Sequence, residues 1–183
     1  MARTVLVTGA SGFVGSHLLP LVAAEPGVAI EAWTRDVVPA GQAARWTVID
    51  MGDRREVARA IAAAPPDEVY HLAGAAHVGQ SFSSVADTLA TNALGTALLV
   101  DALRAHAPRA RLLVVSSSTV YRPATPALTE TSPVGPTSPY GLSKLAAERL
   151  AVRAWEGDGP HTVVARAFNH VGPRQSPAFF ASS

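Results

Sequence analysis

Three glycines, Gly9, Gly12 and Gly15, follow a short apolar run near the start of the chain. Glycine permits backbone angles that a β-carbon forbids, and it lets another group approach the main chain closely. A helix that begins at such a turn offers unpaired N–H groups and a positive dipole end to an anion. The sequence therefore predicts a strand over 4–8, a tight turn, and a helix over 13–24 that together can hold the pyrophosphate of a dinucleotide.

The glycine spacing leaves one alternative open. The glycines stand at every third position, whereas the dinucleotide fingerprint has a tighter first pair. An ordinary glycine-rich turn between a strand and a helix is therefore the competing interpretation. The apolar run before the turn and the helical stretch after it favour phosphate binding.

The remainder of the chain alternates short apolar runs with longer helical stretches, which is the pattern of βαβ units in a parallel sheet. Pro65-Pro66 and Pro108 end two of the expected helices, because proline cannot continue the backbone hydrogen-bond ladder. We predict an α/β fold with a Rossmann-type, doubly wound parallel sheet. Beyond the first strand and helix, the expected strands cover 29–34, 46–49, 69–73, 111–116 and 161–168, and the expected helices cover 54–64, 85–107 and 140–155.

The expected domain organisation is a single dinucleotide-binding domain over residues 1–183, a length that suits one domain with a substantial core. Residues 169–183 follow the last expected strand and are too few to form a domain of their own. We expect them to begin a substrate-binding region. The C-terminal substrate domain is expected to be largely absent, as if the chain had been cut.

Composition narrows the classes of function. Hydrophobic residues make up 48% of the chain and charged residues 16%, a balance typical of a globular protein. The formal net charge is +1 without a Lys/Arg block, so we expect no nucleic-acid partner. The chain has no cysteine, and its six histidines show no metal-ligand spacing, so no metal site is expected. No membrane-spanning stretch or signal peptide is recognisable, which favours the cytoplasm.

The end of the second expected strand bears on the choice of cofactor. This position normally carries an acid that binds the ribose 2′-hydroxyl of NAD, but here Thr34 is followed by Arg35. A guanidinium can make paired, charge-assisted bonds to a 2′-phosphate. We therefore expect NADP(H) as the preferred cofactor, with NAD(H) also allowed. A solvated surface arginine, partly neutralised by Asp36, is the alternative.

Residues after the first, third and fourth expected strands complete the expected cofactor site. Asp50 and Met51 could touch the adenine, although a plain loop aspartate is the alternative. Leu72, Ala73 and Gly74 end the fourth strand and leave space for a ribose. The glycine turn contributes Gly9, Ser11, Gly12, Phe13, Val14 and Gly15.

A candidate proton-transfer group lies on the last expected helix. Tyr140 and Lys144 are four residues apart, which places them on one helix face about 6 Å apart along the axis. Ser138 and Pro139 suit the start of this helix. A nearby ammonium would lower the pKa of the phenol from about 10 and activate it as a proton donor. A chance pair on a surface helix is the competing interpretation.

These segments together resemble the extended short-chain dehydrogenase/reductases that act on nucleotide sugars, over almost the whole chain. Two segments, 76–82 and 166–173, are similar to the branch of GDP-mannose 4,6-dehydratases and GDP-6-deoxy-4-keto-mannose reductases. Residues 174–177 favour the reductases within that branch. The resemblance rests on the segments 69–73, 91–96, 115–121 and 138–144, together with the glycine turn.

The resemblance implies roles for individual residues. Ser117, at the end of the fifth strand, corresponds to the catalytic serine or threonine that acts with Tyr140 and Lys144, and Lys144 and Tyr140 also contact the cofactor. Thr119 stands where the family's dehydratases carry a carboxylate base. A threonine hydroxyl cannot remove a carbon-bound proton at neutral pH, so this departure favours reduction or epimerisation. Further implied contacts are Asn92 with the cofactor, and His77, Ser81, Ser117, Thr119, Asn169 and His170 with the substrate.

The expected function is NADP(H)-dependent reduction of a 4-keto-6-deoxy nucleotide sugar, with a GDP-sugar favoured. A 4-epimerase and a 4,6-dehydratase are alternatives on the same residues. A cofactor-binding fragment without turnover is an alternative of another class, because the chain looks cut, and a subunit-interface protein is a third. The resemblance also implies a homodimer formed through the two long helices, although core packing of those helices would give the same sequence pattern.

Overall fold

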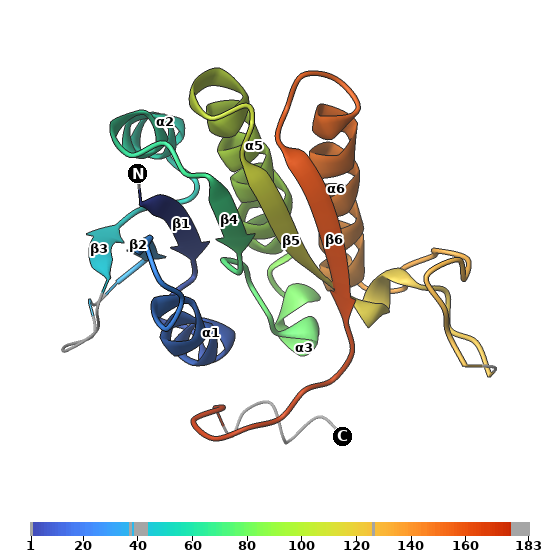
Figure 1. Cartoon of the computed structure of the whole chain (residues 1–183). Coiled ribbons are helices and arrows are strands. Elements are labelled where there is room, and N and C mark those ends of the chain that lie inside the picture. The colour runs from blue at the N-terminus through green and yellow to red at the C-terminus, as the bar shows by residue number, and fades with distance from the viewer. Residues whose placement is uncertain (1, 37, 39–43, 126, 177–183) are drawn as a thin grey trace.

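The structure is a computed structural model that describes residues 2–36, 38, 44–125 and 127–176. Six parallel strands form one sheet in the order β3-β2-β1-β4-β5-β6, as Figure 1 shows, so the predicted α/β, doubly wound Rossmann-type fold is confirmed. The strands are β1 (Arg3–Thr8), β2 (Val28–Thr34), β3 (Arg45–Val48), β4 (Glu68–His71), β5 (Arg111–Ser117) and β6 (His161–Ala167). The longer helices are α1 (Phe13–Ala23), α2 (Arg54–Ala63), α5 (Gly95–His106) and α6 (Pro139–Trp155).

The sheet divides the core into two layers, and β1 shows how. Val5 and Val7 face α1, where they pack with Leu19 and Val22. Leu6 lies between them in the sequence and faces the opposite side, because successive side chains of a strand alternate. That side is covered by α2, α5 and α6, which lie behind the sheet in Figure 1. Helices therefore pack on both faces, as the doubly wound pattern requires.

One predicted helix is interrupted in the structure. The sequence predicts a continuous helix over 85–107, but α4 (Val85–Leu89) and α5 are joined by a π-helical turn, η1 (Ala90–Leu94). The turn brings Asn92 into contact with groups outside its own helix, as described below. The predicted loop over 74–84 also contains a short helix, α3 (Val78–Ser81), and Ser118–Val120 form a 3-10 turn, η2. Most of the other predicted boundaries agree within one residue, and β4 ends two residues earlier than expected.

The strand order fixes where a ligand can bind. Connections from β1 and β4 lead to opposite halves of the sheet, so the order reverses between these two neighbouring strands. At such a switch point the loops that leave the carboxyl ends of the strands diverge and leave a crevice. The glycine turn follows β1, and residues 72–75 follow β4, so both lie at this crevice.

The turn after β1 depends on glycine in two ways at one position. Gly9 has φ +65°, in the left-handed region that favours glycine. A β-carbon on Gly9 would also lie 2.7 Å from the backbone nitrogen of Ala73, in the segment after β4. Gly27, before β2, has a similar φ of +73°, but a β-carbon there would meet nothing within 4 Å. A substitution at Gly27 therefore introduces backbone strain alone, whereas a substitution at Gly9 introduces the same strain together with a steric clash.

We expect Gly9→Ala to lower the free energy of unfolding much more than Gly27→Ala. Gly27→Ala should cost about 1 kcal/mol, the strain of a left-handed alanine. Gly9→Ala should cost at least twice that, because the segment after β4 must also move. Urea denaturation of both variants measures the difference. Equal losses would contradict the close approach of Gly9 to Ala73.

Candidate active site

Helix α6 presents Tyr140 in its first turn, and the start of this helix is specified locally. Ser138 is the N-cap residue, and its hydroxyl accepts a hydrogen bond from the backbone N–H of Gly141 at 3.0 Å. The backbone N–H of Tyr140 donates to Oγ of Ser81 at 3.2 Å. The helix start predicted from Ser138-Pro139 is therefore confirmed, and α3 adds a second anchor through Ser81.

Ser117 meets Tyr140 at the end of β5. Its hydroxyl is hydrogen-bonded to the phenol of Tyr140. The same Oγ accepts hydrogen bonds from the backbone N–H of Thr119 at 3.2 Å and from Oγ1 of Thr119 at 2.9 Å. The structure thus brings together the predicted serine and tyrosine, and Thr119 orients the serine hydroxyl from the next turn of chain.

The pKa of Tyr140 moves in the direction opposite to the expected one. Burial raises the pKa of the phenol, and the hydrogen bond from Ser117 opposes this effect. The expectation that the nearby ammonium lowers this pKa is therefore wrong for the structure, because removing the phenolate from water outweighs the neighbouring groups. Tyr140 is consequently protonated at neutral pH.

Lys144 is the only lysine among the 15 basic residues of the chain. A β-carbon on Gly74, after β4, would lie 3.8 Å from its Nζ, so the amine lies over the crevice beside that glycine. Burial lowers the pKa of Lys144 from 10.5 to about 8, and the charge of Glu148 opposes this effect. Between these two pH values the unfolded chain holds the proton that the folded chain has released. Stability therefore rises with pH in that window as far as Lys144 is concerned.

His71 is buried at the end of β4, within range of the charge of Lys144, and its hydrogen bonds define its protonation state. Oγ1 of Thr96 donates to the carbonyl of Asn92 at 2.6 Å, so it accepts from Nε2 of His71 at 2.9 Å. Oγ1 of Thr8 accepts from the backbone N–H of Ala73 and donates to Nδ1 of His71 at 2.8 Å. His71 is therefore a neutral Nε2–H tautomer. Burial, together with the charge of Lys144, lowers its pKa to about 3.

Asn92 connects the segment after β4 with the catalytic helix. It is 2% exposed, and its Oδ1 accepts from the backbone N–H of Ala75 at 2.8 Å. Its Nδ2 donates to Oγ of Ser143 at 2.9 Å and to the carbonyl of Ala75 at 3.2 Å. The hydroxyl of Ser143 in turn donates to the carbonyl of Tyr140 at 2.7 Å. The amide of Asn92 therefore positions these two segments, and its expected contact with the cofactor stays a prediction.

The glycine turn has the features that an anionic cofactor requires. Gly12 is the N-cap of α1 and makes no side-chain capping bond, and the first turn of α1 contains no acidic residue. The positive end of the helix therefore faces the turn without a neutralising group of its own. A β-carbon on Gly15 would lie 2.4 Å from the carbonyl of Ala10, so glycine is needed for the close packing of the turn. The residues present fit a dinucleotide phosphate.

The other predicted cofactor residues lie around this turn. Oγ of Ser11 is hydrogen-bonded to Oγ1 of Thr34 at 2.7 Å, which joins the turn to the end of β2. The side chain of Arg35 is 82% exposed and pairs with Asp36 at 3.3 Å, as the alternative interpretation expected. The carboxylate of Asp50 accepts from Gly52 N–H at 2.8 Å, so it stabilises its own loop. Leu72 and Met51 pack against the two core layers, Val14 is exposed on the first turn of α1, and Ala73 and Gly74 line the segment after β4.

The segment after β6 runs back toward α1, as the lower part of Figure 1 shows. The ring of His170 stacks on Phe13 with centroids 5.8 Å apart and an interplanar angle of 7°. Farther along, the carbonyl of Pro173 is hydrogen-bonded to Nε2 of His17 at 3.0 Å. His170, expected at the substrate, therefore lies against the glycine turn. Asn169 is exposed beside it.

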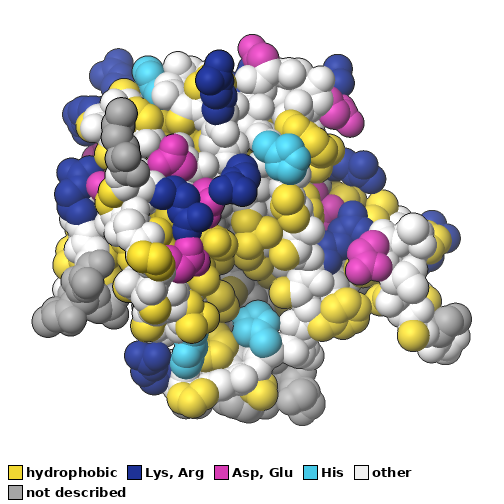
Figure 2. Space-filling view, in the orientation of Figure 1, with side chains coloured by type: hydrophobic (Ala, Val, Ile, Leu, Met, Phe, Trp, Pro, Cys, Tyr) yellow, Lys and Arg dark blue, Asp and Glu magenta, His cyan; other side chains and the backbone are white. Residues whose placement is uncertain are grey.

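The face of the molecule shown in Figure 2 is hollowed near its centre, where apolar side chains gather, and histidine side chains lie below the hollow. His77 is the N-cap of α3 and is half-buried. Ser81 is fully buried, and its hydroxyl donates to the carbonyl of Val78 while it accepts from Tyr140. Ser81 therefore supports α6 in this structure, and its predicted contact with the substrate stays a prediction.

Four of the residues that shape this site are absent from the sequence prediction: His71, Thr96, Ser143 and Glu148. Ser143 stands three residues after Tyr140, so helical spacing could have indicated its place below the site. The partners of the other three come from distant segments, which spacing alone does not reveal. Among the described residues, no group of three or more histidine, aspartate or glutamate side chains could hold a metal ion, and no helix has the length and apolarity needed to cross a membrane. Residues 177–183, which include the last position of the segment 174–177, lie outside the described residues.

Curated relatives cover the whole range of this chain. The GDP-6-deoxy-D-mannose reductase of Pseudomonas aeruginosa is 37% identical over 187 residues, which is 100% of this chain and 57% of that protein. A dTDP-glucose 4,6-dehydratase of Neisseria gonorrhoeae is 33% identical over 96% of this chain and 57% of its own length. The UDP-glucose 4-epimerase 4 of Oryza sativa is 33% identical over 96% of this chain and 51% of its own. The chain therefore spans little more than half the length of these relatives.

Solved structures show the same likeness. MoeE5 in complex with UDP-glucuronic acid and NAD superposes with a TM-score of 0.88 and 34% identity, covering 98% of this chain and 59% of that one. The UDP-glucose 4-epimerase from Brucella ovis in complex with NAD gives a TM-score of 0.85 and 30% identity, covering 92% of this chain and 52% of that one. The sequence profile of the NAD dependent epimerase/dehydratase family matches residues 5–183. With the sheet order and the tyrosine–lysine helix already described, these matches establish that the chain belongs to the NAD dependent epimerase/dehydratase family.

Proposed function

We propose that the natural gene product carrying this chain is an NADP(H)-dependent reductase of a 4-keto-6-deoxy nucleotide sugar, with a GDP-sugar as substrate. The observation that carries the proposal is the meeting of a protonated phenol, a serine hydroxyl and a single amine above the ends of β4 and β5. The similarity to a GDP-6-deoxy-D-mannose reductase supports the choice of substrate class.

Reduction of a ketone requires a hydride at the carbon and a proton at the oxygen. A bound nicotinamide supplies the hydride. Tyr140 donates its phenolic proton to the sugar oxygen, and the raised pKa keeps that proton in place until the reaction begins. Ser117 donates a hydrogen bond that orients the same oxygen. Lys144 would hold the ribose hydroxyls of a bound cofactor and would stabilise the phenolate that remains.

The side chain of Thr119 supports reduction over 4,6-dehydration. Dehydration needs a base that removes a carbon-bound proton, whereas the hydroxyl of Thr119 is a donor to Ser117 at 2.9 Å. The hydroxyl of Thr119 therefore orients Ser117, and it provides no carboxylate that could act as the base. A 4-epimerase would use the same three residues, and only the product distinguishes it from a reductase.

Incubation of the natural gene product with NADPH and GDP-4-keto-6-deoxymannose tests the reaction. We expect NADPH consumption matched by formation of the 4-hydroxy sugar, and a loss of at least about 100-fold in Tyr140→Phe, because the proton donor is removed. Tyr70→Phe, in the middle of β4, is the matched control and should retain the rate. A protein that leaves the keto sugar unreduced, but interconverts the 4-hydroxy sugar and its C4 epimer without net consumption of NADPH, would be a 4-epimerase instead.

The preference for NADP(H) rests on Arg35, whose guanidinium can pair with a 2′-phosphate. We expect Arg35→Ala to weaken NADPH binding about tenfold and to leave NADH binding unchanged, as measured by calorimetry. Arg153→Ala is a close control, because its side chain is also 82% exposed and also pairs with a nearby acid, Glu156. Equal affinity of the unchanged protein for both cofactors would remove the argument for NADP(H).

The alternative of another class is a cofactor-binding fragment. In our proposal residues 1–183 form the dinucleotide-binding domain, and residues 169–183 begin the substrate-binding region. The half-exposed apolar side chains of Leu113 and Val115 on β5, and the exposed Val163 on β6, support further packing on that face of the sheet. Calorimetry on the 183-residue chain that detects dinucleotide binding without turnover would favour the interpretation as a cofactor-binding fragment.

The cytoplasm is the proposed compartment, and cell fractionation tests this location directly.

A homodimer through α5 and α6 is the proposed assembly. Leu150 on α6 is an exposed apolar residue that lines a groove between the two helices, and Leu94, at the end of η1 directly before α5, is also exposed. We expect Leu150→Glu to produce monomers in sedimentation velocity, because a charge in an apolar interface is costly. Leu21→Glu, at a more exposed position on α1, should leave the dimer intact. A monomeric unchanged protein would refute the assembly.

A further inference from the structure

Glu148 lies on the same face of α6 as Tyr140 and Lys144. The three residues are four positions apart, so each step along the helix axis is about 6 Å. Glu148 is 3% exposed. A carboxylate withdrawn from water to this extent destabilises the fold unless it is paired with a positive charge and hydrogen-bonded.

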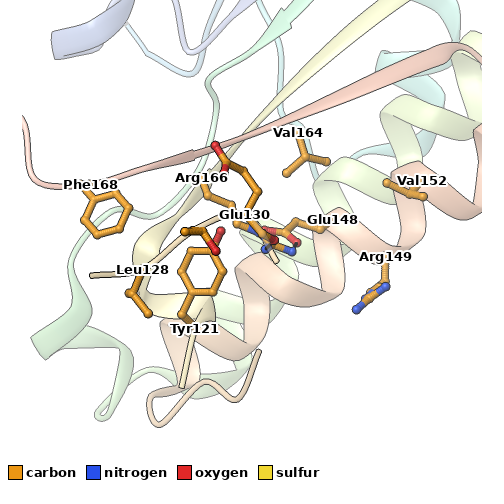
Figure 3. Close-up of a pocket in the computed structure, with 10 residues that line it drawn as sticks. Tyr121, Leu128, Glu130, Glu148, Arg149, Val152, Val164, Arg166 and Phe168 are labelled. Carbon is orange, nitrogen blue, oxygen red and sulfur yellow. Dashed lines mark hydrogen bonds and ion pairs between the residues drawn. The ribbon is translucent and has the colours of Figure 1, made fainter. Parts of the chain in front are cut away.

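Arg166 of β6 provides the paired charge. Its Nε donates to Oε1 of Glu148 at 3.0 Å and its Nη2 donates to Oε2 at 2.8 Å, a two-pronged geometry that fixes both oxygens. Ser116 adds a third bond to Oε1. Figure 3 shows Arg166 and Glu148 beside Tyr121, whose ring centroid lies 4.8 Å from the guanidinium carbon. These contacts hold the carboxylate of Glu148 in one orientation.

The groups around Lys144 leave Glu148 as its main stabilising anion. From β4, His71 faces the amine in its neutral tautomer, and it adds no positive charge. From α6, Tyr140 is protonated and uncharged at neutral pH, which leaves Glu148 as the charged neighbour that favours the ammonium. Burial works in the opposite direction.

The pair with Arg166 also keeps Glu148 from binding Lys144 directly. No ion pair within 4.0 Å joins Lys144 and Glu148 in the structure, although they are one helical turn apart. Both carboxylate oxygens are occupied by Arg166, and one is shared with Ser116. The ammonium is therefore stabilised through space while its three N–H donors stay available for other groups.

We propose that Glu148, held by Arg166, is a positioning residue that keeps Lys144 protonated in the neutral range without engaging its donors. The inference rests on the proposed function, in which Lys144 acts on the cofactor ribose and on Tyr140. Glu148 acts through Lys144 and touches neither substrate nor cofactor. The two members of the Glu148–Arg166 pair give opposite predictions. Loss of the Glu148 carboxylate lowers the pKa of Lys144. Loss of the Arg166 guanidinium frees the carboxylate to bind Lys144 and raises that pKa.

The single lysine permits a direct test. In protein labelled with ¹³C-lysine, one side-chain Cε signal reports the titration of Lys144. We expect Glu148→Gln to lower its midpoint by about one pH unit, and Arg166→Gln to raise it. Glu148→Asp keeps the charge and should stay closer to the unchanged protein than Glu148→Gln. Glu156→Gln, an exposed residue that caps the same helix, should cause no shift.

Two outcomes would overturn the inference: an unchanged midpoint in Glu148→Gln, or equal shifts in Glu148→Gln and Glu148→Asp. The second result would mean that packing, and not charge, is responsible. If Glu148→Gln fails to fold, the double variant Glu148→Gln/Arg166→Gln leaves no unpaired charge inside, and a midpoint that does not fall there is equally contradictory. The side chain of Arg166 is 21% exposed and can reach water, which favours folding of the single variant.

The titration needs no turnover, so it separates this inference from the proposed function. If the reductase proposal is correct as well, the limb of the pH–rate profile that follows Lys144 moves with the NMR midpoint in each variant. A shifted midpoint in a protein that reduces no sugar would leave the role of Glu148 intact and refute the reductase. Normal turnover of the unchanged protein, together with an unshifted midpoint in Glu148→Gln, would support the reductase and refute the role of Glu148.

Discussion

The hydrogen bonds of Asn92 are the constraint on which the geometry of the site depends. One side-chain amide binds both backbone groups of Ala75 and the hydroxyl of Ser143, and so it fixes the end of β4 relative to α6. Each such bond contributes about 1 kcal/mol net, but a buried partner left unpaired costs about 1–3 kcal/mol. The π turn of η1 is the local consequence, since it brings Asn92 toward these partners. The positions of Tyr140 and Lys144 on α6 depend on these hydrogen bonds.

A second constraint is the cost of burying charge. Lys144 and Glu148 are both withdrawn from water, yet each is stabilised by a partner from outside its own helical turn or its own element. Arg166, the partner of Glu148, comes from β6, and the neutral tautomer of His71 is fixed by residues of β1 and α5. The acidic side chain and the two basic side chains thus form an ordered network at and below the surface, and the pKa of Lys144 depends on its neighbours in it.

Much of the fold could be predicted from the sequence. Apolar runs with the period of a strand, helix-ending prolines and the glycine turn gave six strands and the longer helices, most of them within one residue. The break in the helix over 85–107 could not be predicted, because helical propensity is similar on both sides and the π turn is stabilised by Ser143 and Ala75, which lie far away in the chain. The four-residue helix α3 gives too short a pattern to recognise.

The sequence by itself determined the order of the βαβ units, the turn of Gly9 and the spacing of Tyr140 and Lys144, because each of these follows from local backbone chemistry and from helix and strand periods. Only the tertiary structure decided the charge of these groups and the roles of their neighbours. The pKa of Tyr140 rises although its lysine is in the expected place, and Ser81 supports α6 where a ligand contact was expected. The physical reason is that burial and distant partners set both properties, and neither is encoded in the spacing of a motif.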